Sequence, residues 1–409
     1  MKVKTNKIKT KVFLVIFATV IALLLSEIIL RLLIQERIEP TQCRKFDPVL
    51  DHSLVPNSIC RFKTKEWDLE FKVNSQGLRD KEYSIQKPAG VYRIIMLGDS
   101  FVEGYGVNLE DNYGKVLEKM LNENSGKKIE VINAGISGWS PLSQYLYLLE
   151  YGIKYQPDLV ILNFNSTDFF DDYEFYSRLT NEAKQILEQD QKQQLTQAKE
   201  AKKISQSKIF TPKPLYTESV NDPQNIPFVS DRIKFFLNKN FYVYHYLTRS
   251  IKLALGRATT IEVSPKSDRG KMEKDLFAIT RTDNISEYKE LFKRPQEDIL
   301  RMKKIVEGNN SQLMVLLIPH GHMVGGNQWT IGRTPWGFEK GKIYSSQSLK
   351  EISRWAQETG IETFDLTPNL REASKSQKLY FDFDGHWNKN GNKVVAETLL
   401  AVLGLKILN

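Results

Sequence analysis

Ser100 is the residue of this 409-residue chain that is best placed to act as a nucleophile. It ends the sequence Gly98-Asp99-Ser100, which directly follows the largely apolar stretch 91–97. Such a stretch predicts a buried strand, so the sequence presents a hydroxyl group at a strand end. A serine nucleophile also needs a base and a carboxylate that orients the base. Gly-Asp-Ser is a common tripeptide, so its interpretation depends on finding those partners elsewhere.

The base and the orienting carboxylate are expected near the C-terminus, in Asp384-Gly385-His386. Asp384 is two residues from His386, so a local turn can bring its carboxylate to the imidazole; Asp382 is the alternative acid. An isolated Asp-Gly-His usually means a surface acid beside a surface histidine, so the prediction rests on its combination with Gly-Asp-Ser. The other histidines lie in segments for which we expect other roles: His52, His245, His320 and His322.

Short apolar runs and helical patterns alternate beyond residue 90, which predicts a parallel sheet with helices on both faces. The expected strands are 91–97, 129–133, 158–164, 312–318 and 361–365. The expected helices, with apolar residues three and four positions apart, are 112–124, 141–155, 295–307, 345–358 and 390–403. Active sites of such sheets lie beyond the carboxyl ends of the strands, where Ser100 is expected.

The segment 169–310 separates the third and fourth strands by far more than a crossover helix requires, so we interpret it as an insertion. It begins with the polar helical segment 181–207, expected to be a solvated helix. The aromatic stretch 233–247 is expected to serve packing; a sugar or acyl pocket, or contact with a bilayer, is the alternative. The turn-rich segment 35–90 is interpreted as a stalk and lead-in, which leaves 91–409 as the sheet domain.

The N-terminus predicts a membrane anchor. Five lysines within residues 1–11 account for five of the formal net charge of +9, leaving +4 for the rest of the chain. Residues 12–34 are apolar and, as a helix, would extend roughly 35 Å, enough for a bilayer. Lysine-rich flanks stay cytoplasmic, so residues 35–409 are expected outside the cytoplasm. Glu27 and Arg31 can pair on one helix face. A cleaved signal peptide is the alternative, but no small-x-small cleavage site follows the apolar stretch.

Composition and charge limit the other partners. Cys43 and Cys60 are the two cysteines of the chain, and in an oxidising compartment they can form a disulfide; two buried thiols are the alternative. No basic stripe is present, so a nucleic-acid partner is not expected. His320 and His322 lack a third ligand, so we expect neither a metal ion nor another cofactor.

These residues resemble the sequence blocks of the SGNH (GDSL-type) hydrolases, over residues 91–403. The first block matches Gly98-Asp99-Ser100, the second Asn133 to Ser140, and the last Asp384-Gly385-His386. The resemblance implies a flavodoxin-like, three-layer α/β/α fold with five parallel strands. It also implies that the N–H groups of Ser100 and Gly138 stabilise an oxyanion, a task for which glycine leaves the backbone accessible. The stretch 71–80 resembles the lead-in of membrane-anchored bacterial members.

The third block departs from the family pattern. Gly-x-Asn-Asp is expected at residues 165–168, where Thr167 occupies the position of the asparagine. The Thr167 hydroxyl is therefore expected to be the third oxyanion donor, with Asn165 as the alternative. Loss of one such donor typically costs about a hundred- to a thousandfold in rate. The Asp-x-His spacing resembles the members that act on O-acetyl groups of cell-surface polysaccharides.

We therefore expect an extracytoplasmic serine esterase or O-acyltransferase of the bacterial cytoplasmic membrane, acting on small acyl esters such as O-acetyl groups of envelope glycans. Ser100 is expected to attack, His386 to carry the proton and Asp384 to orient His386. One alternative is a catalytically weakened polysaccharide-binding or envelope-assembly protein, and another is a phospholipase. The acyl group, the acceptor and the oligomeric state stay open.

Overall fold

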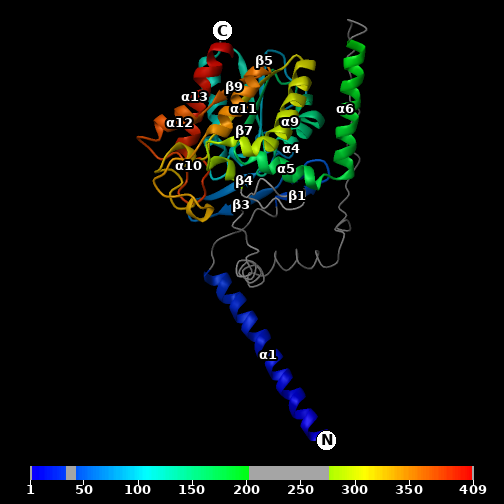
Figure 1. Cartoon of the computed structure of the whole chain (residues 1–409), viewed down its shortest axis with the longest axis vertical. Coiled ribbons are helices and arrows are strands. Elements are labelled where there is room, and N and C mark those ends of the chain that lie inside the picture. Colours follow the sequence, from blue (N-terminus) through cyan, green and yellow to red (C-terminus); the bar gives the residue numbers. More distant parts are fainter. Residues whose placement is uncertain (1, 34–42, 202–275, 408–409) are drawn as a thin grey trace. The chain divides into compact units, whose positions relative to one another are not determined.

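The computed structural model describes residues 2–33, 43–201 and 276–407 (Figure 1). The chain forms two compact units, of which one comprises Met1–Arg37 and Gln193–Ile261, and the other Ile38–Lys192 and Glu262–Asn409. In the first unit, the longest described element is helix α1 (Lys2–Leu33). The second unit contains the sheet and all of the predicted site residues.

Helix α1 confirms that the predicted N-terminal segment 12–34 is helical as far as Leu33. Across the described residues, however, none of the helices combines the length and the apolar character that a bilayer crossing requires. The structure therefore does not support the membrane span predicted for residues 12–34.

The second unit is built around a five-stranded parallel sheet in the order β6-β5-β7-β8-β9. These strands are β5 (Val91–Gly98), β6 (Lys128–Gly135), β7 (Leu159–Asn165), β8 (Gln312–Ile318) and β9 (Glu362–Asp365). All five predicted strands are confirmed, with bounds that differ by a few residues. The chain winds from β5 to one side for β6 and to the other side for β7, which creates a switch point at the carboxyl end of β5.

Helices cover both faces of the sheet, as predicted (Figure 1). One face packs against α3 (Tyr113–Asn124), α12 (Thr367–Ala373) and α13 (Lys389–Ile407). The other packs against α4 (Pro141–Glu150), α5 (Asp168–Arg178), α9 (Lys289–Gly308) and α11 (Gln347–Glu358). Short helices in the connections are α2 (Ser100–Glu103), α10 (Gly321–Val324) and the 3-10 helices η2 (Leu109–Asp111), η3 (Gly152–Tyr155), η5 (Ala278–Thr280), η6 (Ile285–Tyr288) and η7 (Thr334–Trp336). Successive β5 side chains enter opposite cores because strand side chains alternate between faces.

The predicted insertion, 169–310, is partly built into these layers. α9 packs against α4, α5 and β8, so the insertion's C-terminal part belongs to the sheet domain. α6 (Asn181–Ala201) confirms the helix predicted for 181–207 as far as Ala201. The aromatic stretch 233–247 lies outside the described residues.

Two antiparallel hairpins precede the sheet: β1 (Arg44–Asp47) with β2 (Asp51–Leu54), and β3 (Ile59–Lys63) with β4 (Asp68–Lys72). Their side chains Leu50, Leu54, Phe62 and Phe71 are buried in the same core as one face of the sheet. From Cys43 onward, the segment that we expected to be a stalk and lead-in is therefore packed into the sheet unit. We call residues 43–83 the lead-in segment.

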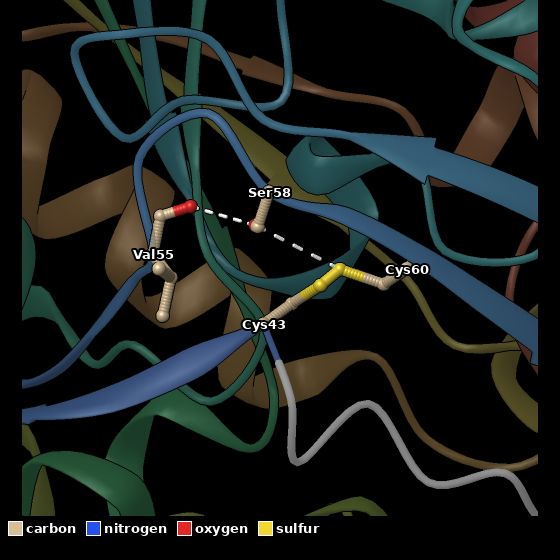
Figure 2. The surroundings of a disulfide bond; sticks show 4 residues. All are labelled: Cys43, Val55, Ser58 and Cys60. Carbon is tan, nitrogen blue, oxygen red and sulfur yellow. Dashed lines mark hydrogen bonds between the residues drawn. A yellow bond between two sulfur atoms is a disulfide. The ribbon is translucent and has the colours of Figure 1, made fainter.

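A disulfide joins the two hairpins. Cys43 precedes β1 and Cys60 lies in β3, with their Cα atoms 6.1 Å apart (Figure 2). Beside it, the Ser58 hydroxyl donates to the Val55 carbonyl at 2.6 Å. Of the two alternatives for these cysteines, the structure has the disulfide.

Candidate active site

Ser100 is presented by a sharp turn between β5 and α2. A Cβ atom on Gly98 would lie 2.2 Å from the Val102 side chain, so a glycine at the strand end lets α2 fold back against the sheet. The Asp99 side chain caps α2 by accepting from the Phe101 N–H at 2.9 Å. Ser100 is thereby the first residue of the helix, where backbone N–H groups have no intrahelical partner.

The structure brings Ser100, His386 and Asp384 together. The Ser100 hydroxyl lies 2.6 Å from Nε2 of His386, although 286 positions separate the two residues. Nδ1 of His386 is hydrogen-bonded to the Asp384 carboxylate. The alternative acid, Asp382, is instead paired with Lys378 at 2.5 Å and accepts from the Thr330 hydroxyl. The order serine, imidazole, carboxylate is the one that general-base activation of a hydroxyl requires.

The turn that joins Asp384 to His386 depends on Gly385. Its φ of 89° lies in the left-handed region, and an added Cβ would lie 2.7 Å from the Trp329 indole. The rings of Phe101 and Tyr105 both contact the imidazole, with centroids 4.9 Å and 5.0 Å from that of His386. The imidazole is thus held by a hydrogen bond at each nitrogen and by contacts with two aromatic rings.

Nearby carboxylates raise the pKa of His386. Burial is the largest single influence and by itself lowers that pKa, but the charge of Asp384, its hydrogen bond and further carboxylates together outweigh it. Asp99 and Glu103 act in the same direction. The pKa of His386 therefore lies above its ordinary value, so the neutral ring is a stronger base than a free histidine.

Gly138, the residue expected to supply the second oxyanion donor, follows the neighbouring strand β6. Its φ of 87° lies in the left-handed region, which glycine adopts readily because it has no Cβ atom. The preceding Ser137 is fixed because its N–H and its hydroxyl both donate to the Glu103 carboxylate, the N–H at 2.6 Å. In the described part of the chain, the Gly138 N–H has no hydrogen-bond partner. Its role as an oxyanion donor stays a prediction.

Thr167 follows β7, the other neighbour of β5. Both its N–H and its hydroxyl donate to Oδ1 of Asn165, at 2.8 Å and 2.9 Å. The amide nitrogen of Asn165 in turn donates to Asp99 at 2.9 Å. Both candidates for the third oxyanion donor are therefore engaged with each other and with Asp99, and the role of Thr167 stays a prediction.

His320 and His322 lie beyond the carboxyl end of β8, and each is hydrogen-bonded to a different hydroxyl group. His320 is 3.0 Å from the Ser166 hydroxyl, and burial lowers its pKa to about 3, so its ring is neutral. His322 is hydrogen-bonded to Thr280 at 2.9 Å, and burial lowers its pKa as well. Within residues 2–33, 43–201 and 276–407, no three His, Cys, Asp or Glu side chains form a group that could hold a metal ion.

Two contacts with the loops of the site were not foreseen from the sequence. Glu66 of the lead-in segment accepts from backbone N–H groups beside Asp384, and His52 of β2 contacts the backbone beside Gly138. Glu66 is 318 positions from Asp384 and His52 is 85 positions from Ser137, so no local spacing signals either contact. The adjacent Asp51-His52 pair was the one available signal, and it falls in a segment that we expected to be a stalk.

Sequence comparison finds two families along the chain. Residues 96–234 match the GDSL-like lipase/acylhydrolase family, and residues 276–407 match the SGNH hydrolase-like domain of the acetyltransferase AlgX. The first match contains Ser100 and the second contains Asp384 and His386. A comparison with curated proteins finds no match.

Solved structures that resemble the chain share little sequence with it. A lipolytic protein of the G-D-S-L family from Desulfitobacterium hafniense is 14% identical, with a TM-score of 0.34, over 76% of this chain and 99% of that one. The acetylxylan esterase Axe2 from Geobacillus stearothermophilus is 13% identical, with a TM-score of 0.35, over 78% and 96%. These similarities are too weak to carry an argument about activity.

Proposed function

Because both sequence matches support an SGNH hydrolase-like protein, we propose that this chain is an extracytoplasmic serine esterase or O-acyltransferase that acts on small acyl esters. The observation that carries this proposal is the continuous hydrogen-bonded series from the Ser100 hydroxyl through His386 to Asp384. The series lies at the switch point of the sheet, where open α/β folds bind their ligands.

In the proposed first step, the Ser100 hydroxyl oxygen attacks the carbonyl carbon of the ester while its proton moves to Nε2 of His386. Asp384 holds the proton on Nδ1, so Nε2 is the nitrogen that accepts. The C–O bond of the ester then breaks, the leaving alkoxide takes the proton from His386, and the acyl group stays on Ser100. A water or a sugar hydroxyl attacks this acyl group in the second step, giving its proton to His386, which returns it to Ser100.

The developing oxyanion is proposed to bind the N–H groups of Ser100 and Gly138. They follow the adjacent strands β5 and β6, whose carboxyl ends are paired through Gly98 and Gly135. Each donor in such a site typically contributes about a hundred- to a thousandfold in rate. Two backbone donors support acyl transfer without the third donor predicted at Thr167.

The substrate is proposed to be an acyl ester outside the cytoplasm, for example an O-acetylated envelope glycan. The C-terminal match to an acetyltransferase domain and the Asp-x-His spacing support this class. The disulfide between Cys43 and Cys60 supports an oxidising compartment. Attachment to a membrane through residues 12–34 is proposed from the sequence alone.

The direct test is hydrolysis of 4-nitrophenyl acetate by the full chain and by its Ser100→Ala variant. We expect release of nitrophenol by the parent protein and loss of at least about a thousandfold in kcat in the variant, because the nucleophile is absent. Equal rates for the two proteins, with binding of the ester or of a glycan retained, would instead favour the binding-protein alternative.

A second assay separates hydrolysis from transfer. The full chain is given 4-nitrophenyl acetate with an excess of a de-acetylated envelope glycan, and the glycan is analysed by mass spectrometry. A mass increase of one acetyl group identifies transfer, and free acetate alone identifies hydrolysis. Fatty acid released from phospholipid vesicles, with neither of these products, would support a phospholipase.

A further inference from the structure

The lead-in segment reaches the loop that carries the base. Glu66 lies in the turn between β3 and β4, and its carboxylate accepts from three successive backbone N–H groups. These are the N–H groups of Asp382, Phe383 and Asp384, at 2.7, 3.1 and 2.9 Å. Successive N–H groups that converge on one anion form a backbone nest, and hydrogen bonds to a charged acceptor are roughly twice as strong as neutral ones.

The turn around Glu66 is itself fixed. The Thr64 hydroxyl oxygen accepts from the N–H groups of Glu66 and Trp67 at 3.1 Å and 3.2 Å, and the Thr64 N–H donates to the Trp67 carbonyl at 2.8 Å. Trp67 is buried against the ring of Tyr105, which also contacts His386. The backbone of this turn is therefore fixed against the core by Trp67, and the half-buried Glu66 side chain extends from it.

The loop 382–386 depends on hydrogen bonds from other segments, because its own side chains contribute little packing. Phe383 is 45% exposed, and Gly385 offers no side chain to pack. The carbonyl groups of Asp382 and Phe383 are bound by Ile331, Gly332 and Trp329, at 2.8 to 3.1 Å. The N–H groups of the loop are bound by Glu66. Without Glu66, three successive donors, two of them on the half-buried residues Asp382 and Asp384, lose their acceptor directly beside the Asp384 carboxylate.

We propose that Glu66 is a positioning residue that fixes loop 382–386 so that the Asp384 carboxylate faces His386. The expected effect of Glu66 on catalysis rests on the proposed function. Its expected effect on the conformation of the loop rests only on the hydrogen bonds of the structure. Misplacement of a catalytic group by about 1 Å can cost about a hundredfold in rate.

The test compares Glu66→Gln and Glu66→Ala with the control Glu70→Gln in the full chain. Glu70 is an exposed acid of β4 in the same hairpin, paired with Lys72 at 3.4 Å. We expect kcat for 4-nitrophenyl acetate to fall about 10- to 100-fold in both Glu66 variants with little change in KM, and to stay at the parental value in the control. All rates are measured well below the Tm of each variant, so that loss of fold does not contribute.

A second readout needs no turnover. The proton between His386 and Asp384 is expected to give a downfield ¹H NMR signal in the resting protein, in Ser100→Ala and in Glu70→Gln, and to weaken or vanish in Glu66→Ala. A parental signal together with parental kcat in Glu66→Ala overturns the role of Glu66. If the Ser100→Ala variant is as active as the parent, the proposed function fails instead, and the NMR signal alone decides on Glu66.

An independent observation concerns His52 of β2. Its Nε2 is 2.9 Å from the Ser137 carbonyl oxygen, and its Nδ1 is 3.0 Å from the Asp51 carboxylate. A carbonyl oxygen can only accept, so Nε2 of His52 is the donor to the Ser137 carbonyl. The Ser137 carbonyl and the Gly138 N–H belong to the same peptide group. A donor on the carbonyl polarises that peptide and strengthens its N–H as a donor in turn.

From this geometry we infer that His52 is a positioning residue for the oxyanion hole, because it orients and polarises the peptide that carries the Gly138 N–H. Like the previous inference, it rests on the proposed function. The ring also lies beside Gly138, since a Cβ built there would be 3.6 Å from Cε1 of His52. The lead-in segment thus contacts both loops that complete the site.

The variants His52→Gln and His52→Phe separate donation from packing. Phenylalanine keeps a ring beside Gly138 and donates nothing, whereas glutamine can still donate to the Ser137 carbonyl. We expect kcat to fall about 10-fold in His52→Phe, with KM unchanged. This loss is smaller than that caused by removing a whole oxyanion donor. In His52→Gln we expect most of the activity to be retained. Parental kcat in His52→Phe, or an equal loss in both variants, overturns this inference while Ser100→Ala still tests the proposed function.

Discussion

At the scale of residues, the properties of the site come from the partners of three side chains. His386 is hydrogen-bonded at both nitrogens, the Asp384 carboxylate is hydrogen-bonded to Nδ1 of His386, and Ser100 lies half-buried at a helix start. None of these arrangements needs an unusual residue type. The property that sets this site apart from an ordinary histidine environment is the raised pKa of His386, which follows from the carboxylates around a partly buried ring.

This raised pKa predicts the pH dependence of activity. The base must be neutral to accept the Ser100 proton, so activity is lost as the pH falls through the pKa of His386. Because that pKa is raised, we expect the acid limb of the pH profile of kcat/KM to lie above 6.5, the ordinary histidine value. Asp384→Asn removes the strongest raising interaction and should move the limb to lower pH while reducing kcat. An acid limb at the same pH in both proteins contradicts this assignment.

Thr167 provides a second prediction at this scale. Its hydroxyl donates to Asn165 in the structure, so it is already engaged before any substrate binds. We expect Thr167→Val, which removes the hydroxyl but keeps the shape, to lower kcat by less than about 10-fold. A loss of about a hundredfold or more, in assays with the same ester, would show that the hydroxyl turns to the oxyanion during the reaction.

At the scale of elements, the lead-in segment is more than a connection. Its two hairpins are closed by the disulfide between Cys43 and Cys60, with a sequence separation of 17. In the chain-entropy account, closing a loop of this size stabilises a fold by about 3 kcal/mol. The same hairpins carry Glu66 and His52, so the disulfide stabilises the segment that supports both loops of the site.

We therefore expect the double variant Cys43→Ala, Cys60→Ala to lose about 3 kcal/mol of unfolding free energy relative to the parent protein. Urea denaturation followed by tryptophan fluorescence measures this difference. Addition of a reductant should lower the transition midpoint of the parent and leave that of the double variant unchanged. Equal midpoints for the two oxidised proteins would mean that the disulfide does not constrain the unfolded chain appreciably.

The strands and helices of the sheet domain could be predicted from the sequence, whereas the hairpin strands before it could not. The parallel strands β5, β6, β7 and β8 were predicted because each is a largely apolar segment of seven or eight residues, and α13 and α11 because their apolar residues recur at helical spacing. The hairpin strands escaped prediction because they are four or five residues long and carry many charges, such as Arg44–Asp47. Their burial depends on contact with the sheet, which short local patterns do not reveal.

At the scale of the whole molecule, the site is assembled from segments distant in sequence. Ser100, Gly138 and Thr167 follow three adjacent strands, so parallel strand order alone predicts their proximity. The pairing of His386 with Ser100 followed from their chemistry and from the resemblance to the SGNH hydrolases. The supports from Glu66 and His52 could not be predicted, because they depend on how hairpins 43–72 dock beside the sheet.

The central claim is that Ser100 is a nucleophile activated by His386, and covalent labelling tests it most directly. The full chain is incubated with a fluorophosphonate, and the adduct is located by tandem mass spectrometry. We predict one phosphonyl group on the peptide that contains Ser100, formed more slowly at acid pH as His386 becomes protonated. An unmodified Ser100 peptide after prolonged incubation of the folded protein would contradict the claim.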